Sequence, residues 1–338
     1  MTFPKNFEAF VVTQPADPSV EEFVLNSSVN TLSQEALDPG DVLVQIKYSA
    51  LNYKDGLAAA GNPGVARKFP LIPGVDAVGV VLESGDEQFS IGDEVLIGHA
   101  KFGTAHHGGF AKLARVPAGW VYRLPAGLTP LDAVTLGTAG FTAARSVEKI
   151  VNHGIKPEDG DVLVTGATGG VGVLAVKLLA QLGYRVVAST GKVDKHEWLK
   201  RLGAAEVITR EQTCNLSEAP LLKGRWAAIV DTVGGSTLAS VLREADLHSC
   251  VTTCGNVAGT VLATTVFPFI LRGITLCGID SANTGRDDRI QVWNKLAGDW
   301  KMDLGEIRSE VGLEGLPEEI MKILNGKIFG RSIINMDR

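Results

Sequence analysis

The chain has 338 residues, of which 45% are hydrophobic and 21% charged, and its formal net charge is −6 at pH 7. This composition is typical of a folded globular protein and excludes a disordered or collagen-like chain. The small negative charge excludes a surface that attracts nucleic acid or anionic lipid as a whole. At about 150 residues per domain, the length predicts two domains.

The first third of the chain predicts short strands. These segments are rich in Val, Ile, Leu and Phe, and turn residues such as Pro, Gly and Asp separate them. The predicted strands are 7–12, 42–50, 76–83, 94–97, 110–116 and 121–124. Such spacing is typical of an all-β, partly closed sheet.

The pattern changes after Pro130. Residues 131–153 contain few helix breakers and predict one or two helices. Apolar strands then alternate with helical or irregular segments, which predicts a doubly wound (Rossmann) α/β domain with a parallel six-stranded sheet. The predicted strands are 161–165, 185–189, 206–208, 227–231, 249–254 and 274–279, with helices at 171–182 and 194–202.

The last segment leaves this alternation. Residues 287–300 and 317–324 predict helices, and 331–335 predict a final strand. A strand that follows helices in this way is expected to return to the first sheet. We therefore predict a discontinuous catalytic and substrate domain at 1–135 plus 280–338, with a cofactor-binding domain at 136–279 inserted between its parts.

A glycine-rich turn follows the first strand of the predicted parallel sheet. Gly166, Gly169 and Gly172, with an additional Gly170, lie between that strand and an apolar helix. Glycines at this spacing permit a tight turn, a close approach to a pyrophosphate and close packing of helix on strand. Free N–H groups at the helix start then favour the negative charge of the pyrophosphate. The turn predicts a dinucleotide site.

The end of the second strand indicates which dinucleotide binds. An NAD site carries a carboxylate there, about 20 residues past the glycines. This chain has Ser189, Thr190, Gly191 and Lys192 instead, and hydroxyls with an ammonium favour the 2′-phosphate of NADPH. Lys192 as an ordinary solvated lysine is the alternative. Arg210, just past the third strand, is a candidate second phosphate contact.

The sequence predicts no metal site and no membrane segment. The four cysteines form no CxxC pair, and His99, His106 and His107 have no cysteine beside them. The most apolar window, 257–271, is too short and too interrupted to span a bilayer. The first ten residues lack the apolar core of a signal peptide. We expect a soluble, cytoplasmic protein.

Four segments together resemble the medium-chain dehydrogenase/reductase superfamily, in its zinc-free quinone-oxidoreductase branch. They are SALNYKD at 49–55, PLIPGVD at 70–76, GTAGFTA at 137–143 and the glycine turn. Zinc members carry glycine-histidine-glutamate where this chain has Gly74-Val75-Asp76. The resemblance implies that the first domain is GroES-like.

Within that branch the chain is most similar to the acrylyl-CoA reductase group. Gly234 and the runs at 264–272, 278–281 and 326–331 carry this similarity. It implies NADPH-dependent reduction of an activated carbon–carbon double bond, with hydride reaching the β-carbon of a small-molecule substrate. The implied cofactor contacts are Tyr53, Thr168, Gly169, Gly170, Val171, Thr190, Gly191, Lys192, Arg210, Asn256, Ile270, Ser281 and Arg331.

Tyr53 is the candidate catalytic residue, with Asn52 and Asp55 as groups that orient it or cap a helix. Two roles stay open for Tyr53: it donates a proton, or its ring only packs on the cofactor. Arg67 and Lys68 are either contacts of CoA phosphates or solvated charges.

Two other functions stay open as well. One is a quinone or enone reductase that uses the same site, and the other is a non-catalytic NADPH-binding sensor. The apolar stretch at 257–271 near a sheet edge predicts a homodimer.

Overall fold

The computed structural model describes residues 5–14, 27–215, 217 and 219–338. Contacts divide the chain into two compact units. Unit 1 comprises Met1–Thr138, Ala282–Ala297 and Asp303–Arg338. Unit 2 comprises Ala139–Ser281 and Gly298–Met302. The assignment of catalytic and cofactor-binding roles to two domains with the predicted boundaries stays a prediction.

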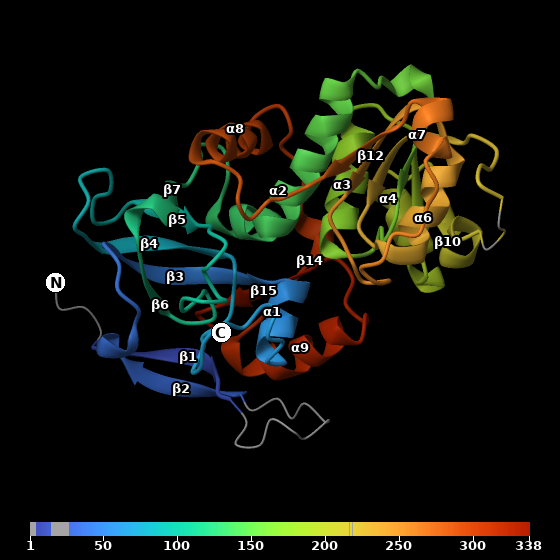
Figure 1. Cartoon of the computed structure of the whole chain (residues 1–338). Helices are drawn as coiled ribbons and strands as arrows, with labels where there is room; N and C mark the ends of the chain where they lie inside the picture. The colour runs from blue at the N-terminus through green and yellow to red at the C-terminus, as the bar shows by residue number, and fades with distance from the viewer. Residues whose placement is uncertain (1–4, 15–26, 216, 218) are drawn as a thin grey trace. The chain divides into compact units, whose positions relative to one another are not determined.

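Unit 1 is built on a seven-stranded sheet and a separate two-stranded sheet (Figure 1). The larger sheet has the order β14-β15-β3-β4-β5-β7, with β6 also paired to β3, and the smaller pairs β1 with β2. The strands are β1 (Asn6–Val12), β2 (Ser27–Ser33), β3 (Val42–Leu51), β4 (Ala77–Ser84), β5 (Glu94–Ile97), β6 (Leu113–Val116), β7 (Val121–Arg123), β14 (Arg308–Val311) and β15 (Arg331–Asn335). In the hydrophobic core shared by the two sheets, the side chains of Phe10 and Phe110 are fully buried and their rings meet edge to face.

The six strands predicted for the first third of the chain are confirmed, with one shortened. The segment 110–116 pairs as a regular strand only from Leu113, because Phe110 and Ala111 instead contact the β1 segment. The predicted return of the final strand is also confirmed, since β15 runs antiparallel to β3 with Ile333 opposite Ala50.

Unit 1 also contains the helices α1 (Tyr53–Ala59), α8 (Arg286–Ala297) and α9 (Leu316–Leu324), and the start of α2 (Pro130–His153). α1 packs closely on α9, because a Cβ at Gly56 would lie 3.0 Å from the Ile323 side chain. α2 is interrupted at Gly137, whose φ of 47° and ψ of −150° are not helical. The segment predicted as one or two helices is therefore two helical pieces that meet at a break.

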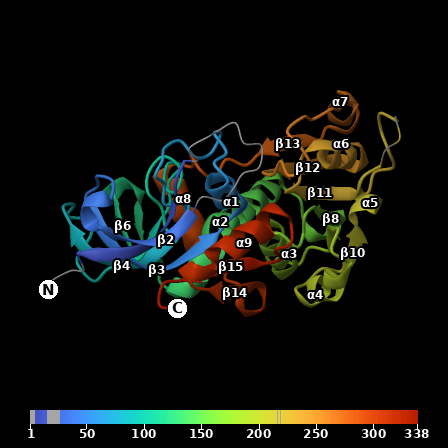
Figure 2. The same cartoon turned by 90° about the horizontal axis from the view of Figure 1, so that it is seen from below.

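Unit 2 is a parallel six-stranded sheet in the order β10-β9-β8-β11-β12-β13, with β13 at one edge (Figure 2). Its strands are β8 (Asp161–Val164), β9 (Val186–Thr190), β10 (Glu206–Thr209), β11 (Trp226–Asp231), β12 (Ala245–Thr253) and β13 (Thr275–Gly278). Its other helices are α3 (Gly170–Gln181), α4 (His196–Arg201), α5 (Arg210–Thr213), α6 (Gly235–Glu244) and α7 (Phe267–Arg272). The order places the third, second and first strands on one side and the fourth to sixth on the other, which confirms the Rossmann arrangement. A ligand site is expected where the order reverses, between β8 and β11.

Within the part of the chain that the structure describes, no helix is both long enough and apolar enough to cross a membrane.

Candidate active site

The glycine turn joins β8 to α3 at the point where the strand order reverses. Gly166 has a φ of +60°, which glycine adopts at little cost. A Cβ at Gly172 would lie 2.3 Å from the Gly166 carbonyl oxygen, so this position must be glycine for α3 to pack on the turn. A Cβ at Gly169 would meet only that same oxygen, at 3.3 Å. The turn is therefore closed on the side of Gly172 and open at Gly169.

The start of α3 presents backbone N–H groups at this open position. Gly169 is the N-cap and has no side chain to occupy them. The first residues of the helix, Gly170 and Val171, are half-buried. Uncapped N–H groups at the start of a twelve-residue helix are suited to a pyrophosphate.

Two cations converge beyond the end of β9. A Cβ at Gly191 would lie 3.1 Å from a guanidinium nitrogen of Arg210, so that guanidinium lies over Gly191. Burial, and secondarily the charge of Arg210, lowers the pKa of Lys192. The backbone N–H of Lys192 donates to Thr190 Oγ1, which lies 3.0 Å from Thr168 Oγ1. Residues predicted from two separate strand ends are thus brought together, and their charge suits a phosphate.

A carboxylate also lies near this cluster, and its charge partly opposes the lowering of the Lys192 pKa by burial and Arg210. Asp194 is exposed and forms an ion pair with Lys195 at 3.1 Å. No carboxylate occupies positions 189–192, where an NAD site would have one.

Asp231, at the end of β11, is a residue that the sequence analysis missed. Its buried carboxylate accepts from Thr165 Oγ1 at 2.7 Å and from Thr253 Oγ1 at 3.0 Å. It also accepts from the Gly234 N–H, and burial raises the pKa of its carboxyl. Asp231 thereby ties the carboxyl ends of β8, β11 and β12 together. A single acidic residue that ends an apolar strand was the available signal.

Of the remaining predicted cofactor contacts in unit 2, Asn256 and Ser281 follow the carboxyl ends of β12 and β13, whereas Ile270 lies on α7, before β13. Asn256 is exposed in the loop after β12, and Gly255 beside it packs against the backbone of Thr232. Ile270 lies on α7 with 67% of its surface exposed, and Ser281 follows β13. Their contact with a cofactor stays a prediction.

Tyr53 begins α1 in unit 1 and is 37% exposed. Asn52 is the N-cap of this helix, and its backbone N–H donates to Asp55 Oδ2 at 2.8 Å. Asp55 is fully buried, and burial raises the pKa of its carboxyl to about 7 although four N–H groups point at it. Asn52 and Asp55 therefore cap the helix whose first residue is Tyr53. Whether they also orient Tyr53 for the reaction stays a prediction.

Arg331 lies in unit 1 and is only 3% exposed. Its guanidinium donates to the carbonyl oxygen of Thr135 and to Asn52 Oδ1, and it pairs with Asp76 at 3.5 Å. Its Nη2 has no hydrogen-bond partner among the described residues, so the protein does not satisfy the whole guanidinium. The predicted role of Arg331 in cofactor binding stays a prediction. Asp76, which the sequence analysis considered only as a departure from a zinc motif, is the centre of this network.

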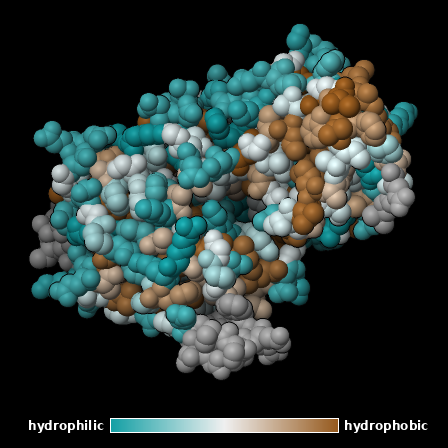
Figure 3. Space-filling view, in the orientation of Figure 1, coloured by the Kyte–Doolittle hydropathy of each residue, from teal (hydrophilic) through white to brown (hydrophobic). Residues whose placement is uncertain are grey.

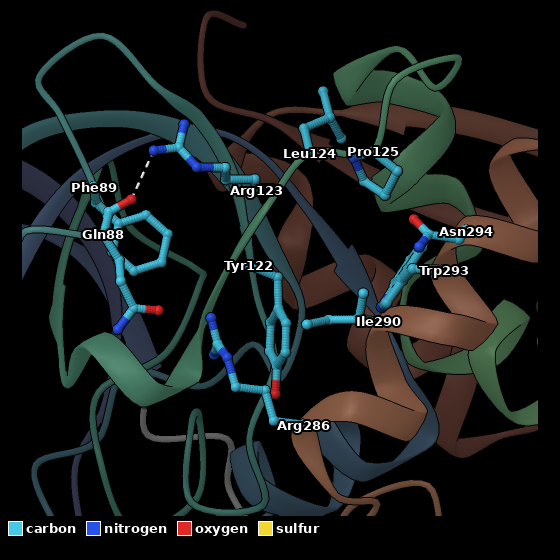
Figure 4. A pocket seen from close by; sticks show the side chains of 10 residues that line it. All are labelled: Gln88, Phe89, Tyr122, Arg123, Leu124, Pro125, Arg286, Ile290, Trp293 and Asn294. Atoms are coloured by element: carbon cyan, nitrogen blue, oxygen red, sulfur yellow. Dashed lines mark hydrogen bonds between the residues drawn. The ribbon is translucent and has the colours of Figure 1, made fainter.

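One cavity of about 370 Å³ lies in unit 1, against α8 and β7, and none of the predicted site residues lines it (Figure 4). Its two arginines are occupied by the protein. Arg123 donates to the Gln88 carbonyl oxygen, as the dashed line shows, and pairs with Asp93. Arg286 lies over the ring of Tyr122 and donates to the Val121 carbonyl oxygen. We assign this cavity no role in the reaction.

The described residues contain no group of three or more His, Cys, Asp or Glu side chains placed to hold a metal ion. Burial raises the pKa of the Cys250 and Cys254 thiols to about 12, which disfavours the thiolates that zinc requires. Asp76, at the position of the zinc motif, is engaged with Arg331 and Thr138. These residues do not fit a zinc ion, and the absence of a metal stays a prediction.

Comparisons with known proteins cover most of the chain. Residues 38–126 match the family model of the alcohol dehydrogenase GroES-like domain, and residues 170–298 match that of the zinc-binding dehydrogenases. The putative quinone oxidoreductase YhfP of Bacillus subtilis is 44% identical, over 91% of this chain and 94% of its own. The probable acrylyl-CoA reductase AcuI of Escherichia coli is 42% identical, over 92% and 96%.

Solved structures give the same picture. The yhdH oxidoreductase of Salmonella enterica in complex with NADP is 40% identical with a TM-score of 0.92, over 97% of this chain and 99% of that one. Bacillus subtilis yhfP with NAD bound is 42% identical with a TM-score of 0.92, over 98% and 100%. The relatives thus include structures with either dinucleotide.

Proposed function

Because the chain belongs to the medium-chain dehydrogenase/reductase superfamily, in the group of acrylyl-CoA reductases and related quinone oxidoreductases, we propose that it is an NADPH-dependent reductase of an activated carbon–carbon double bond. Its proposed substrate is a short enoyl-CoA such as acrylyl-CoA. The carrying observation is full-length similarity to acrylyl-CoA reductases, 42% identical to one and 40% to another.

The cofactor proposal rests on the cations beyond β9. Lys192 and Arg210 supply the positive charge that a 2′-phosphate needs, and Thr190 supplies a hydroxyl. The open position at Gly169 and the N–H groups of Gly170 and Val171 would hold the pyrophosphate. One relative is solved with NAD, so the preference for NADPH is measured against NADH.

NADPH, when bound, supplies hydride from C4 of its nicotinamide ring. This chain must then provide two things: donors for the negative charge that develops on the substrate carbonyl oxygen, and a route for a proton to the α-carbon. Tyr53 is the proposed residue for orienting the reacting groups, since it is exposed on a helix turn that buried groups hold in place. Solvent is the proton source if Tyr53 only packs.

The CoA portion of the substrate requires cations for its phosphates. Lys68 is bound to both oxygens of Asp38 at 2.5 Å, so its charge is neutralised within the protein. Arg67, which directly precedes Lys68, is exposed, and its backbone N–H donates to the Thr104 carbonyl oxygen. Of the two basic residues considered, we propose Arg67 alone as a phosphate contact.

We also propose a homodimer formed through the β13 edge of the unit 2 sheet. An unpaired edge strand exposes backbone groups to a second copy of the chain. Apolar side chains gather next to it, over the region of α7 (Figure 3). Val261, Val266 and Ile270 are each more than 60% exposed there. Light scattering that gives the mass of one chain at micromolar concentration would exclude this dimer.

The cytoplasm is the proposed location. All four cysteines are free, including Cys250 and Cys277 on the neighbouring strands β12 and β13. Free thiols are the usual state in a reducing compartment.

The proposed function is tested with a panel of acrylyl-CoA, crotonyl-CoA, small enones and small quinones, each with NADPH. Oxidation of NADPH that is fastest with acrylyl-CoA supports the proposal. Turnover of quinones alone supports the related activity for which YhfP is named. Tight NADPH binding without oxidation by any compound supports a non-catalytic sensor.

A further inference from the structure

A cluster of three buried charged side chains lies under the helix turn of Tyr53 in unit 1. Asp55, Asp76 and Arg331 are each at most 5% exposed, although they are distant in sequence. Asn52 joins them, since its Nδ2 donates to Asp76 Oδ2 at 2.8 Å and its Oδ1 accepts from Arg331 at 3.0 Å. Buried charges of this kind are costly unless each has partners, so their retention needs an explanation.

One side of the cluster holds the start of α1. Asn52 is the N-cap of this helix, and Tyr53 is its first residue. Arg331 donates to the Asn52 side chain and also, at 3.4 Å, to the Leu51 carbonyl oxygen. The direction in which the first turn of α1 presents Tyr53 therefore depends on Arg331 and on Asp76, the buried carboxylate with which Arg331 pairs.

The other side of the cluster holds the break in α2. Asp76 Oδ1 accepts from the backbone N–H of Thr138 at 2.8 Å and from its hydroxyl at 2.6 Å. Arg331 Nε donates to the Thr135 carbonyl oxygen at 2.9 Å, on the other side of Gly137. Asp76 thus supplies the acceptor for the second helical piece, and Arg331 supplies the donor for the first.

Gly137 makes this arrangement possible. A Cβ there would lie 2.4 Å from Asp76 Oδ2 and 3.2 Å from Arg331 Nη2. Its φ of 47° is also one that other residues rarely adopt. The chain therefore leaves space at the break for the two charged groups to meet.

We propose that the Asp76–Arg331 pair is a positioning unit for the reaction, which fixes the Tyr53 turn of α1 and the break in α2 in one shared arrangement. This inference rests on the proposed function for its activity readout. It assigns the pair no contact with substrate. Loss of the pair would therefore lower turnover through Tyr53, while the cofactor groups of unit 2 are left as they are.

Three variants separate positioning from simple stability: Asp76→Asn, Arg331→Met and the double variant. Each single variant leaves one buried charge without its partner and should lower Tm sharply. The double variant removes both charges, so its Tm should recover above that of either single variant. Its kcat, with NADPH and acrylyl-CoA or with the best substrate of the panel, should stay at least tenfold below wild type.

The matched control is the ion pair of Asp132 and Arg308, at 2.8 Å, which joins α2 to β14 in the same unit. The double variant Asp132→Asn/Arg308→Met should change kcat less than twofold. If kcat of the Asp76→Asn/Arg331→Met variant recovered together with its Tm, the pair would be only a stability element and the proposal would be overturned.

Hydrogen exchange tests the same inference without any substrate. In the double variant at Asp76 and Arg331, amides of 53–56 and 138–141 should exchange faster together, whereas those of the control double variant should match wild type. Unchanged exchange in both segments would overturn the proposal, whatever the substrate proves to be. Faster exchange in a protein that reduces no compound of the panel would uphold the shared arrangement and reject only the proposed function.

Discussion

Two glycines of the β8–α3 turn should respond to substitution in opposite ways. Gly169 has an ordinary extended backbone, with φ −76° and ψ 168°, and an added Cβ would meet a single atom at 3.3 Å. Gly169→Val should therefore fold, with a loss of stability of about 1 kcal/mol or less. Its side chain would enter the space proposed for the pyrophosphate. NADPH affinity should fall at least 100-fold, or about 2.8 kcal/mol at 1.4 kcal/mol per tenfold.

Gly172 is the matched control in the same turn. Its added Cβ would lie 2.3 Å from the Gly166 oxygen and 2.8 Å from Ala167 Cα, and backbone atoms cannot move away cheaply. Gly172→Ala should thus lose about 1–3 kcal/mol of stability through overpacking. The assays are Tm of the cofactor-free proteins and titration of NADPH by fluorescence. If Gly169→Val bound NADPH within threefold of wild type, the turn would not be the pyrophosphate site. If Gly169→Val fails to fold, Gly169→Ala repeats the test.

Four further predictions address the cofactor, the catalytic residue, pH and metal. Wild type should bind NADPH at least tenfold tighter than NADH, and Lys192→Ala should reduce that ratio; equal Kd values for the two dinucleotides in wild type would reject the assignment. If Tyr53 donates the α-proton, Tyr53→Phe should lower kcat about 100-fold or more with an unchanged NADPH Kd, whereas full turnover of that variant would leave solvent as the donor. Burial lowers the pKa of His107 to about 4, and its neutral Nδ1 accepts from the Ile72 N–H. The pKa of His107 in the folded state lies below its unfolded value near 6.5. Its contribution to the free energy of unfolding is therefore fully present above pH 6.5 and is lost as the pH falls toward 4. The unfolding free energy of wild type, relative to His107→Asn, should fall by about 1–2 kcal/mol over that range, and a constant difference would contradict this. Activity should survive prolonged treatment with a strong chelator, and stoichiometric zinc in the purified protein would contradict this.

The fold was predictable where hydrophobic patterning is strong. All six parallel strands of unit 2 follow apolar runs, and β15 was predicted with its observed limits, 331–335. β2 and β14 were missed because their sequences, SSVNTLS and RSEV, are largely polar, and β2 is largely exposed. Sheet edges and small outer sheets do not need an apolar face, so they leave little pattern to detect.

The candidate site also has parts that could be predicted from the sequence and parts that could not. Glycine spacing and the missing acid after β9 are local features, so the dinucleotide turn and Lys192 could be read from the sequence. Arg210 could only be proposed as a contact, and the structure supplies its place over Gly191. The network of Asp76 and Arg331 could not be predicted, because the two residues are 255 positions apart and meet through the pairing of β3 with both β15 and β4.

The most direct test of the proposed function is the fate of labelled hydride. NADPH with both hydrogens at C4 of its nicotinamide replaced by deuterium is incubated with acrylyl-CoA and the enzyme, and the thioester product is examined by mass spectrometry and NMR. The account predicts propionyl-CoA with one deuterium at the β-carbon and, at the α-carbon, one new hydrogen that derives from solvent. Unlabelled acrylyl-CoA recovered intact, while a quinone in a parallel reaction takes up the reducing equivalents, would contradict it.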